Sequence, residues 1–183
     1  VNHYEQYEKS YATNVQGVKN LIKFAKTDEK KVLHHISTTS VASGNIENER
    51  HVIFRESDMD LGQKPVNVYV DTKIQAEKLL LVAREEGVVS NVYRVGNLQC
   101  HSKTGVFQDN AIQNASFSMV YALLRMKKYP LILRELNFNC VDHIAKACVL
   151  LMRDTKLCNE TYHLINKNML NLHTLMQRYQ AAS

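Results

Sequence analysis

Residues 68–95 read VYVDTKIQAEKLLLVAREEGVVSNVYRV, and this stretch decides the fold class. Its apolar residues recur at helical spacing as far as Ala83, and Gly87 then stands where helices commonly end on a glycine. Residues 88–95 follow as an apolar run of strand length. A helix that leads directly into an apolar strand is a unit from which parallel α/β sheets are built.

The same alternation of helix and strand extends in both directions along the chain. Apolar residues between Tyr4 and Ala25 recur at steps of three and four and predict one continuous helix, while residues 31–37 predict a short buried strand. Further helices are predicted at 117–126, 141–152 and 170–179, and extended segments at 130–133 and 162–165. This order predicts an α/β fold with a parallel sheet.

One long polar stretch interrupts this alternation. Residues 38–65 show no periodicity and are punctuated by Gly44, Gly62 and Pro65. A stretch of this length without periodicity is typical of a functional or mobile loop.

The composition is that of a soluble globular domain. The 183 residues suffice for one domain with a sizeable core, and the net charge of +5 is spread without a basic stripe for nucleic acid. The absence of C-x-x-C spacing argues against a metal site or disulfide framework and favours a reducing, cytoplasmic compartment; the four cysteines are Cys100, Cys140, Cys148 and Cys158. No apolar run approaches the ~20 residues of a membrane span, and no signal peptide is evident. We therefore expect neither a nucleic-acid nor a membrane partner.

Tyr69 and Lys73 form the most informative pair of side chains. Residues four apart on a helix lie on the same face, so the phenol and the ammonium can address one site. A free tyrosine has a pKa of about 10, and a nearby ammonium is expected to lower that pKa toward the working range of an acid–base catalyst. Taken alone, the pair fits a solvated surface helix better.

Polar residues follow two of the predicted strands. Thr38 and Thr39 come after residues 31–37, and Gly96 and Asn97 come after residues 88–95. Because ligands bind at the carboxyl ends of strands in open α/β sheets, we expect these residues at one edge beside the helix with the phenol and the ammonium. Such a set is suited to polarising a carbonyl oxygen. The alternative is that the threonines only satisfy backbone groups, as Ser/Thr clusters often do.

The glycine-rich start of a dinucleotide-binding sheet is missing. Such a sheet opens with a strand, a glycine-rich turn and a helix, and no G-x-G-x-x-G occurs in the sequence. The chain also begins at a valine, within sequence that already has the pattern of a helix. We therefore expect it to be the later part of a longer protein.

Several short motifs nevertheless occur in a characteristic order. The chain contains Ser37-Thr38-Thr39-Ser40-Val41, Tyr69-x-x-x-Lys73 and Tyr93-Arg94-Val95-Gly96-Asn97-Leu98. Accompanying segments are Val1-Asn2-His3-Tyr4, Asn14-Val15-Gln16-Gly17-Val18, Gly62-Gln63, Ala76-Glu77, Thr104-Gly105-x-Phe107-Gln108-x-Asn110 and Val141-Asp142. With these motifs the chain resembles the extended short-chain dehydrogenase/reductases. Within them it is most similar to the terminal thioester reductase domains of nonribosomal peptide synthetases and the related aminoadipate and carboxylic acid reductases.

The resemblance implies a Rossmann-like parallel sheet with a small substrate-binding subdomain. Residues 1–100 would be the C-terminal part of the catalytic domain, and residues 101–183 mainly the substrate-binding subdomain with returning strand and helix elements. By position, Thr38 matches the catalytic serine or threonine, with Thr39 as runner-up. Tyr69 matches the catalytic acid. Lys73 matches the residue that lowers the pKa of that acid and holds the nicotinamide ribose.

The resemblance also implies roles for residues around this centre. Val95, Gly96 and Asn97, with Tyr69 and Lys73, match the residues that bind the cofactor. A structural role is implied for Asn14. Arg94 is expected to anchor a structural carboxylate, and a substrate contact is the alternative.

The implied activity is reduction by NADPH, or by NADH, of an acyl or peptidyl thioester. The thioester would be carried by a phosphopantetheinyl carrier domain and released as an aldehyde or an alcohol, with no metal involved. Two other interpretations stay open: an extended family member acting on a nucleotide sugar or another small carbonyl, and a non-catalytic fragment or carrier-docking module. Thr39-Ser40 counts against a sugar dehydratase, which should have acidic residues there. We expect the isolated chain to be inactive.

Overall fold

The computed structural model describes residues 6–27, 29–49, 51–128, 130 and 135–182. Contacts divide the described residues into two compact units. The sheet unit contains residues 6–95 and 148–164, and the C-terminal unit contains residues 96–147 and 165–182. The predicted helical residue Tyr4 and most of the predicted extended segment 130–133 lie outside the described residues.

The sheet unit is built on three parallel strands. They are β1 (Leu33–Thr38), β2 (Ser90–Val95) and β6 (Thr161–Leu164), in the order β1-β2-β6. Thr38 lies opposite Val95, and Val95 lies opposite Leu164, so the carboxyl ends of all three strands meet at one edge. The predicted parallel sheet is confirmed.

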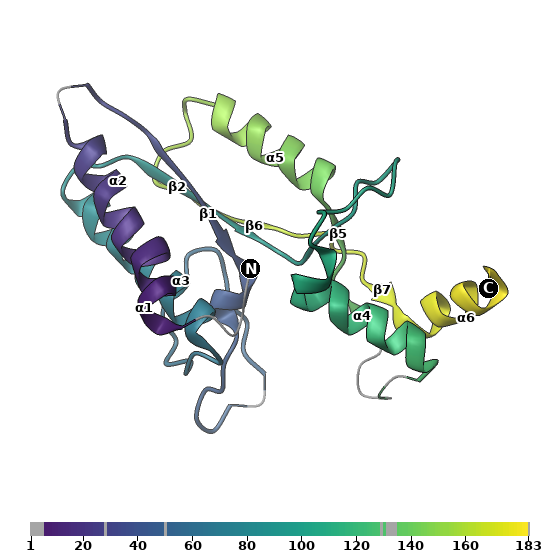
Figure 1. Ribbon diagram of the computed structural model, residues 1–183. Coiled ribbons are helices and arrows are strands. Elements are labelled where there is room, and N and C mark those ends of the chain that lie inside the picture. Colours follow the sequence, from purple (N-terminus) through teal and green to yellow (C-terminus); the bar gives the residue numbers. More distant parts are fainter. Residues whose placement is uncertain (1–5, 28, 50, 129, 131–134, 183) are drawn as a thin grey trace. The chain divides into compact units, whose positions relative to one another are not determined.

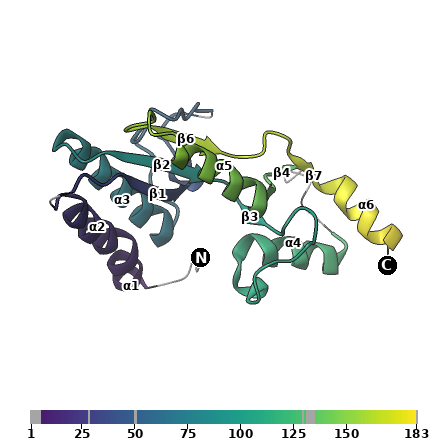
Figure 2. The same cartoon turned by 90° about the horizontal axis from the view of Figure 1, so that it is seen from above.

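Helices cover one face of this sheet. The first helical run consists of α1 (Tyr7–Tyr11), a π-helical turn (Ala12–Gln16) and α2 (Gly17–Ala25), and the long helix α3 (Val68–Glu85) lies beside it. Figure 1 and Figure 2 show α2 and α3 on the same side of β1 and β2. The core between these elements consists of Val18, Ile22, Ala25, Ala76, Leu80, Ala83, Val88 and Val92.

Both ends of α3 follow from the sequence. At its start, the Asn67 side chain accepts a hydrogen bond of 2.9 Å from the Val70 amide, which is an N-cap. At its end, Gly87 has a φ of +90°, in the left-handed region that favours glycine. There the Val88 amide donates to the Ala83 carbonyl at 2.9 Å, which closes the helix.

Strand β1 differs from its prediction as a buried strand. Val32 and Ile36 are exposed, Ile36 by 43%, whereas all six residues of β2 are buried. The reason is that one face of β1 is uncovered: exposed residues alternate with others such as Leu33, which packs against the core under the helices. An apolar run shows that a strand forms but not how many of its sides are covered.

The long polar stretch after β1 is irregular but anchored. It begins with a 3₁₀ turn (Thr39–Ala42), and a bridge between Asn45 and Lys64 ties its two ends together. A small cluster of Val41, Val70 and Ile74, with Phe54, Met59 and Tyr69 around it, packs this stretch against the start of α3.

The C-terminal unit contains short paired segments that the sequence did not predict. β3 (Leu98–Gln99) pairs in parallel with β5 (Asn139–Cys140), and β4 (Glu135–Leu136) pairs antiparallel with β7 (Leu170–Asn171). Around them lie α4 (Ala115–Met126) and α6 (Leu172–Ala182), with a core of Val120, Leu123, Leu136 and Leu172. The last helix therefore begins at Leu172 rather than residue 170, since residues 170–171 form β7.

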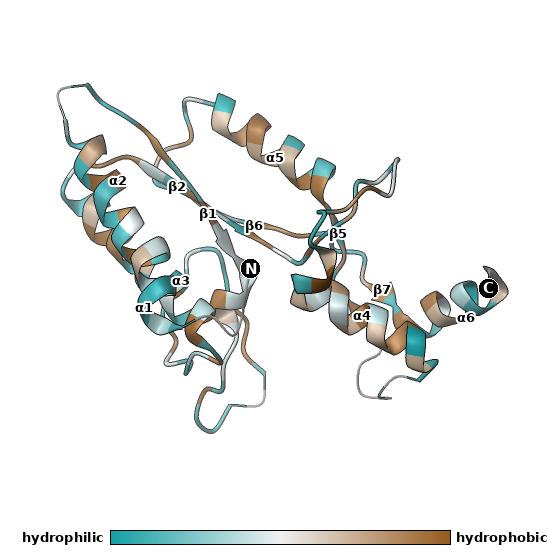
Figure 3. Ribbon diagram, in the orientation of Figure 1, coloured by the Kyte–Doolittle hydropathy of each residue, from teal (hydrophilic) through white to brown (hydrophobic). Residues whose placement is uncertain are grey.

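Helix α5 (Val141–Arg153) contributes residues to both units. Hydrophobic and hydrophilic bands alternate along it in Figure 3, as expected of an amphipathic helix. None of the helices in the described residues is long and apolar enough to cross a membrane.

Candidate active site

Thr38 lies at the carboxyl end of β1 and is only 8% exposed. Its Oγ1 accepts a hydrogen bond of 3.1 Å from the Ser40 amide and so caps the 3₁₀ turn that follows. Thr38 therefore satisfies a backbone group, which was the alternative expected for this threonine cluster. Because that bond uses an oxygen lone pair, the hydroxyl proton of Thr38 is still available to a second partner.

Tyr69 provides that second partner from the first turn of α3. A hydrogen bond joins the Thr38 and Tyr69 side chains. Burial raises the pKa of Tyr69, and the bond from Thr38 partly opposes this increase. The phenol is thus held next to the strand end in its protonated form.

Lys73 lies one turn further along α3. Its Nζ donates to the Ile36 carbonyl at 3.1 Å, and burial lowers its pKa while the Glu77 carboxylate acts in the opposite direction. The pKa of Tyr69 is raised in this structure rather than lowered, because desolvation of the phenol outweighs the opposing hydrogen bond. The role of Lys73 in lowering that pKa stays a prediction.

The predicted cofactor segment is divided between the two units. Val95 belongs to the sheet unit and lies directly opposite Thr38, whereas Gly96 and Asn97 belong to the C-terminal unit. The Asn97 carbonyl accepts two hydrogen bonds of 3.1 Å from the backbone and side-chain amides of Asn139. Gly96 is in tight contact there, because a Cβ at this position would collide with the Asn137 and Asn139 side chains.

Asn14 supports the site from the π-helical turn. Its Nδ2 donates to Thr72 Oγ1 at 3.0 Å, and the fully buried Thr72 in turn donates to the carbonyls of Val68 and Tyr69 at 3.0 and 3.1 Å. The implied structural role of Asn14 fits these contacts, since its side chain fixes the turn of α3 that carries Tyr69. π-Turns inside helices are frequent near functional sites.

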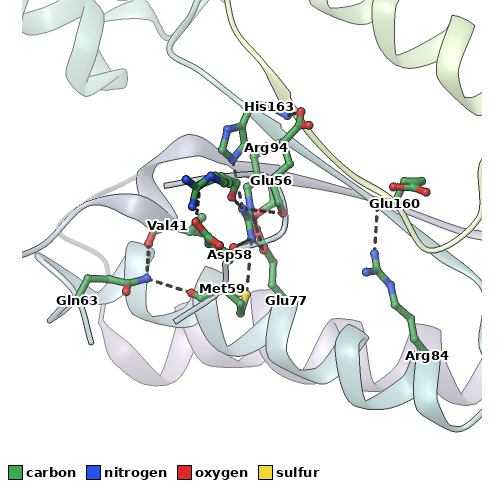
Figure 4. A network of polar contacts seen from close by, with 12 residues as sticks. Val41, Glu56, Asp58, Met59, Gln63, Glu77, Arg84, Arg94, Glu160 and His163 are labelled. Carbon is green, nitrogen blue, oxygen red and sulfur yellow. Dashed lines mark hydrogen bonds and ion pairs between the residues drawn. The ribbon is translucent and has the colours of Figure 1, made fainter. Parts of the chain in front are cut away.

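A buried charge network lies beside these residues (Figure 4). Arg94 pairs with Glu77 at 2.8 Å, and both side chains are almost completely buried. The expectation that Arg94 anchors a structural carboxylate is confirmed. The additional contacts of Arg94 with the loop and with His163 were not predicted. The signal for them was a single charged residue inside a strand that is otherwise uncharged.

Gln63 ties the same loop to the segment after Thr38. Its Nε2 donates at 3.1 Å both to the Val41 carbonyl and to the Met59 carbonyl, as Figure 4 shows. The side chain is buried, so these bonds form away from water. The sequence placed Gln63 in a characteristic motif without giving it a role.

The donors in the sheet unit suit a nicotinamide cofactor. A phenol, an ammonium and a hydroxyl at the end of a parallel strand are groups that bind ribose hydroxyls and a carbonyl oxygen. No group of three His, Cys, Asp or Glu side chains that could hold a metal ion occurs among the described residues.

Comparison with known proteins agrees with these features. A linear gramicidin synthase polypeptide of Brevibacillus parabrevis is 27% identical over 169 residues, which are 92% of this chain and 3% of that polypeptide. The terminal R domain from the myxalamid PKS-NRPS biosynthetic pathway is 26% identical, with a TM-score of 0.84 over 99% of this chain and 45% of that chain. A thiolation-reductase di-domain from an archaeal non-ribosomal peptide synthetase is 26% identical, with a TM-score of 0.90 over 100% of this chain and 39% of that chain.

The chain thus spans less than half the length of these relatives. The fold class and the resemblance to extended short-chain dehydrogenase/reductases, in particular to terminal reductase domains, are confirmed. An NAD-binding family described as male sterility protein matches residues 1–148. Because this match covers well over half of the sequence, the chain belongs to the NAD-binding male sterility protein family.

Proposed function

We propose that this chain forms the catalytic part of a reductase that uses NADPH, or NADH, to release a carrier-bound acyl or peptidyl thioester as an aldehyde or alcohol. The observation that carries the proposal is the hydrogen bond between Thr38 and Tyr69 at the end of β1, with Lys73 one turn along the same helix. Family membership and the similarity to terminal reductase domains support it.

Thr38 and Tyr69 are the proposed catalytic pair. Without substrate, the single hydroxyl proton of Thr38 is directed at Tyr69, and the raised pKa of Tyr69 keeps the phenol protonated. When substrate binds, Tyr69 donates its own proton to the carbonyl oxygen, and the Thr38 hydroxyl turns from Tyr69 to the same oxygen. Such bonds strengthen as negative charge develops on that oxygen, which stabilises the transition state more than the ground state.

The proposed cofactor residues are those of the sequence motifs. We assign Tyr69 and Lys73 to the ribose of the cofactor, and Val95, Gly96 and Asn97 to its nicotinamide. These residues would hold the cofactor, which would supply the hydride for the carbonyl carbon. Tyr69 gives its proton to the carbonyl oxygen. The resulting hemithioacetal separates into an aldehyde and the carrier thiol, and release as an alcohol would take a second hydride from a second cofactor molecule.

The proposed partner is a phosphopantetheinyl carrier domain. One similar solved structure contains a thiolation domain joined to its reductase domain, and the gramicidin relative is part of a synthase. We further propose that residues 1–100 belong to the catalytic domain and residues 101–183 mainly to a substrate-binding subdomain. The isolated chain is expected to be inactive.

The test uses the natural protein that contains this chain, an acyl-pantetheine thioester and NADPH, with NADPH absorbance as the readout. We expect consumption by the wild type and a loss of about 10²–10⁴-fold in Tyr69→Phe, as for removal of an acid–base group. Tyr7→Phe is the matched control, because Tyr7 is 42% exposed on α1 and has no proposed role in the reaction. No consumption by the wild type, or equal rates in Tyr69→Phe and wild type, would refute the proposal.

A further inference from the structure

Arg94 uses all sides of its guanidinium group inside the sheet unit (Figure 4). Nε and Nη2 donate to the Glu77 carboxylate at 3.0 and 2.8 Å. Nη2 also donates to the Asp58 carbonyl at 2.8 Å, and Nη1 to the Arg55 carbonyl at 3.3 Å. Nη1 further contacts His163 Nε2 on β6 at 3.2 Å. With only 2% of its surface exposed, Arg94 thus joins two strands, a helix and a loop.

The members of this network stand next to the proposed catalytic residues. Ser37 precedes Thr38 on β1 and donates a hydrogen bond to Glu77 Oε1. Glu77 lies one turn after Lys73 on α3, and Arg94 precedes Val95 on β2. Strands β1 and β2 and helix α3 therefore each supply both a proposed catalytic or cofactor-binding group and one buried, charged or hydroxyl side chain of the same junction.

A buried ion pair contributes little net stability, since its desolvation cost offsets its attraction and apolar replacements are often as stable. Such a pair instead fixes the relative orientation of the two groups. The guanidinium is a rigid planar fork. Its Nε and Nη2 both donate to Glu77 Oε2, and Nε also contacts Oε1 at 3.3 Å, so the carboxylate is fixed in distance and in angle. In this structure those groups belong to α3 and β2, and Ser37 extends the restraint to β1.

The same guanidinium holds the loop. Nη1 and Nη2 contact the main-chain carbonyls of Arg55, Glu56 and Asp58, and the Phe54 ring lies 5.0 Å from the guanidinium carbon. The restraint on the active-site elements and the restraint on this loop therefore depend on one side chain.

We infer that Ser37, Glu77 and Arg94 form a buried positioning junction that sets α3, with Tyr69 and Lys73, against Thr38 on β1 and holds loop residues 54–59 beside them. These three residues position the catalytic groups and do not contact the substrate. This inference rests on the proposed reductase function.

The first variant is Arg94→Lys, which keeps the charge near Glu77 but loses the fork and most of the loop bonds. We expect kcat to fall by about 10²-fold, the loss typical of a misplacement of about 1 Å. The KM for NADPH should rise by much less than kcat falls, because the ribose-binding groups on α3 are displaced but none is removed. A kcat equal to that of the wild type would overturn the inference.

The second test is chemical rescue. Glu77 and Arg94 line a hollow of about 270 Å³, which gives a small cation access to the space left by Arg94→Ala. We expect guanidinium at non-denaturing concentration to restore part of the kcat of Arg94→Ala, and urea, which is uncharged and of similar shape, to restore none. The matched control is Arg84→Ala: Arg84 lines the same hollow but bonds to Ser90 and the Glu160 carbonyl. Equal rescue of both variants would contradict the inference.

Two further measurements keep the test independent of folding and of the proposed function. The double variant Glu77→Leu with Arg94→Met leaves no unpaired buried charge, so it should fold. If its thermal unfolding and its kcat both match the wild type, the junction does not position the site. A crystal structure of Arg94→Lys gives a readout without activity: unchanged positions of residues 54–59 and of the first turn of α3 would refute the inference. Failure of the wild type to reduce thioesters would refute only the proposed function.

Discussion

The Arg94–Glu77 pair gives an asymmetric prediction for stability. In Arg94→Met, Glu77 stays buried with only Ser37 as a donor, because both bonds from the guanidinium are lost. In Glu77→Leu, Arg94 still contacts the carbonyls of Arg55 and Asp58 and the His163 ring. The arginine variant should therefore be the less stable of the two.

The magnitudes follow from what remains unpaired. Removing one partner of a buried ion pair costs about 3–5 kcal/mol, which we expect for Arg94→Met. Glu77→Leu should cost about 1–3 kcal/mol, the range for a buried donor group that loses part of its bonding. For a chain of this size the first value lowers Tm by about 6–20 °C. The double variant should cost less than Arg94→Met alone.

The assay is urea unfolding of the chain followed by circular dichroism, with the four proteins of the double-mutant cycle measured together. Arg84→Met is the matched control, since Arg84 is only partly buried and bonds to Ser90 and the Glu160 carbonyl. A cost below about 0.5 kcal/mol for Arg94→Met, as at a surface position, would refute the reasoning. So would a larger cost for Glu77→Leu than for Arg94→Met.

Three other predictions concern single positions. Gly96→Ala should lower Tm, because the added Cβ meets the side chains of Asn137 and Asn139. Gly17→Ala, in open helical surroundings, should instead raise the free energy of unfolding by about 0.4–1 kcal/mol. A higher Tm for Gly96→Ala than for Gly17→Ala would contradict this prediction. Asn67→Ala removes the cap of α3 and should cost about 1 kcal/mol in urea unfolding, and no loss would show that the cap is not stabilising. Burial lowers the pKa of His35 from 6.5 to about 4. As the pH drops from 6.5 to 4, His35 therefore takes up a proton in the unfolded chain before it does so in the folded one. The free energy of unfolding should fall by at most about 3 kcal/mol over this range. His35→Phe should flatten this pH dependence, and an unchanged slope would exclude His35 as its source.

The parts of the fold that repeat a local pattern were predictable. Helix α3 was recognisable because its apolar spacing and Gly87 agree with each other, whereas the capping role of Asn67 emerged only from the structure. The two-residue strands β3, β4, β5 and β7 were not predictable, because pairs this short have no periodicity. The exposed side of β1 was missed for a related reason: hydrophobicity does not show what covers a strand.

The candidate site, too, was predictable only where a sequence motif marks its residues. The motif order placed Thr38 and Tyr69 together, and the structure joins them by a hydrogen bond. The direction of the pKa shift of Tyr69 was missed, since it depends on burial by neighbours distant in sequence. The loop contacts of Arg94 were missed because an irregular loop leaves no pattern for its carbonyl positions.

Those carbonyl contacts have a consequence for how this protein can vary. Arg94 holds the loop through oxygen atoms that every amino acid provides, at positions 55, 56 and 58. The loop can therefore exchange side chains and keep its attachment to the sheet. In evolutionary terms, an anchor to main-chain atoms lets the amino-acid sequence of this loop drift, or adapt to new molecules, while the positions of the strand and helix residues that it covers stay the same.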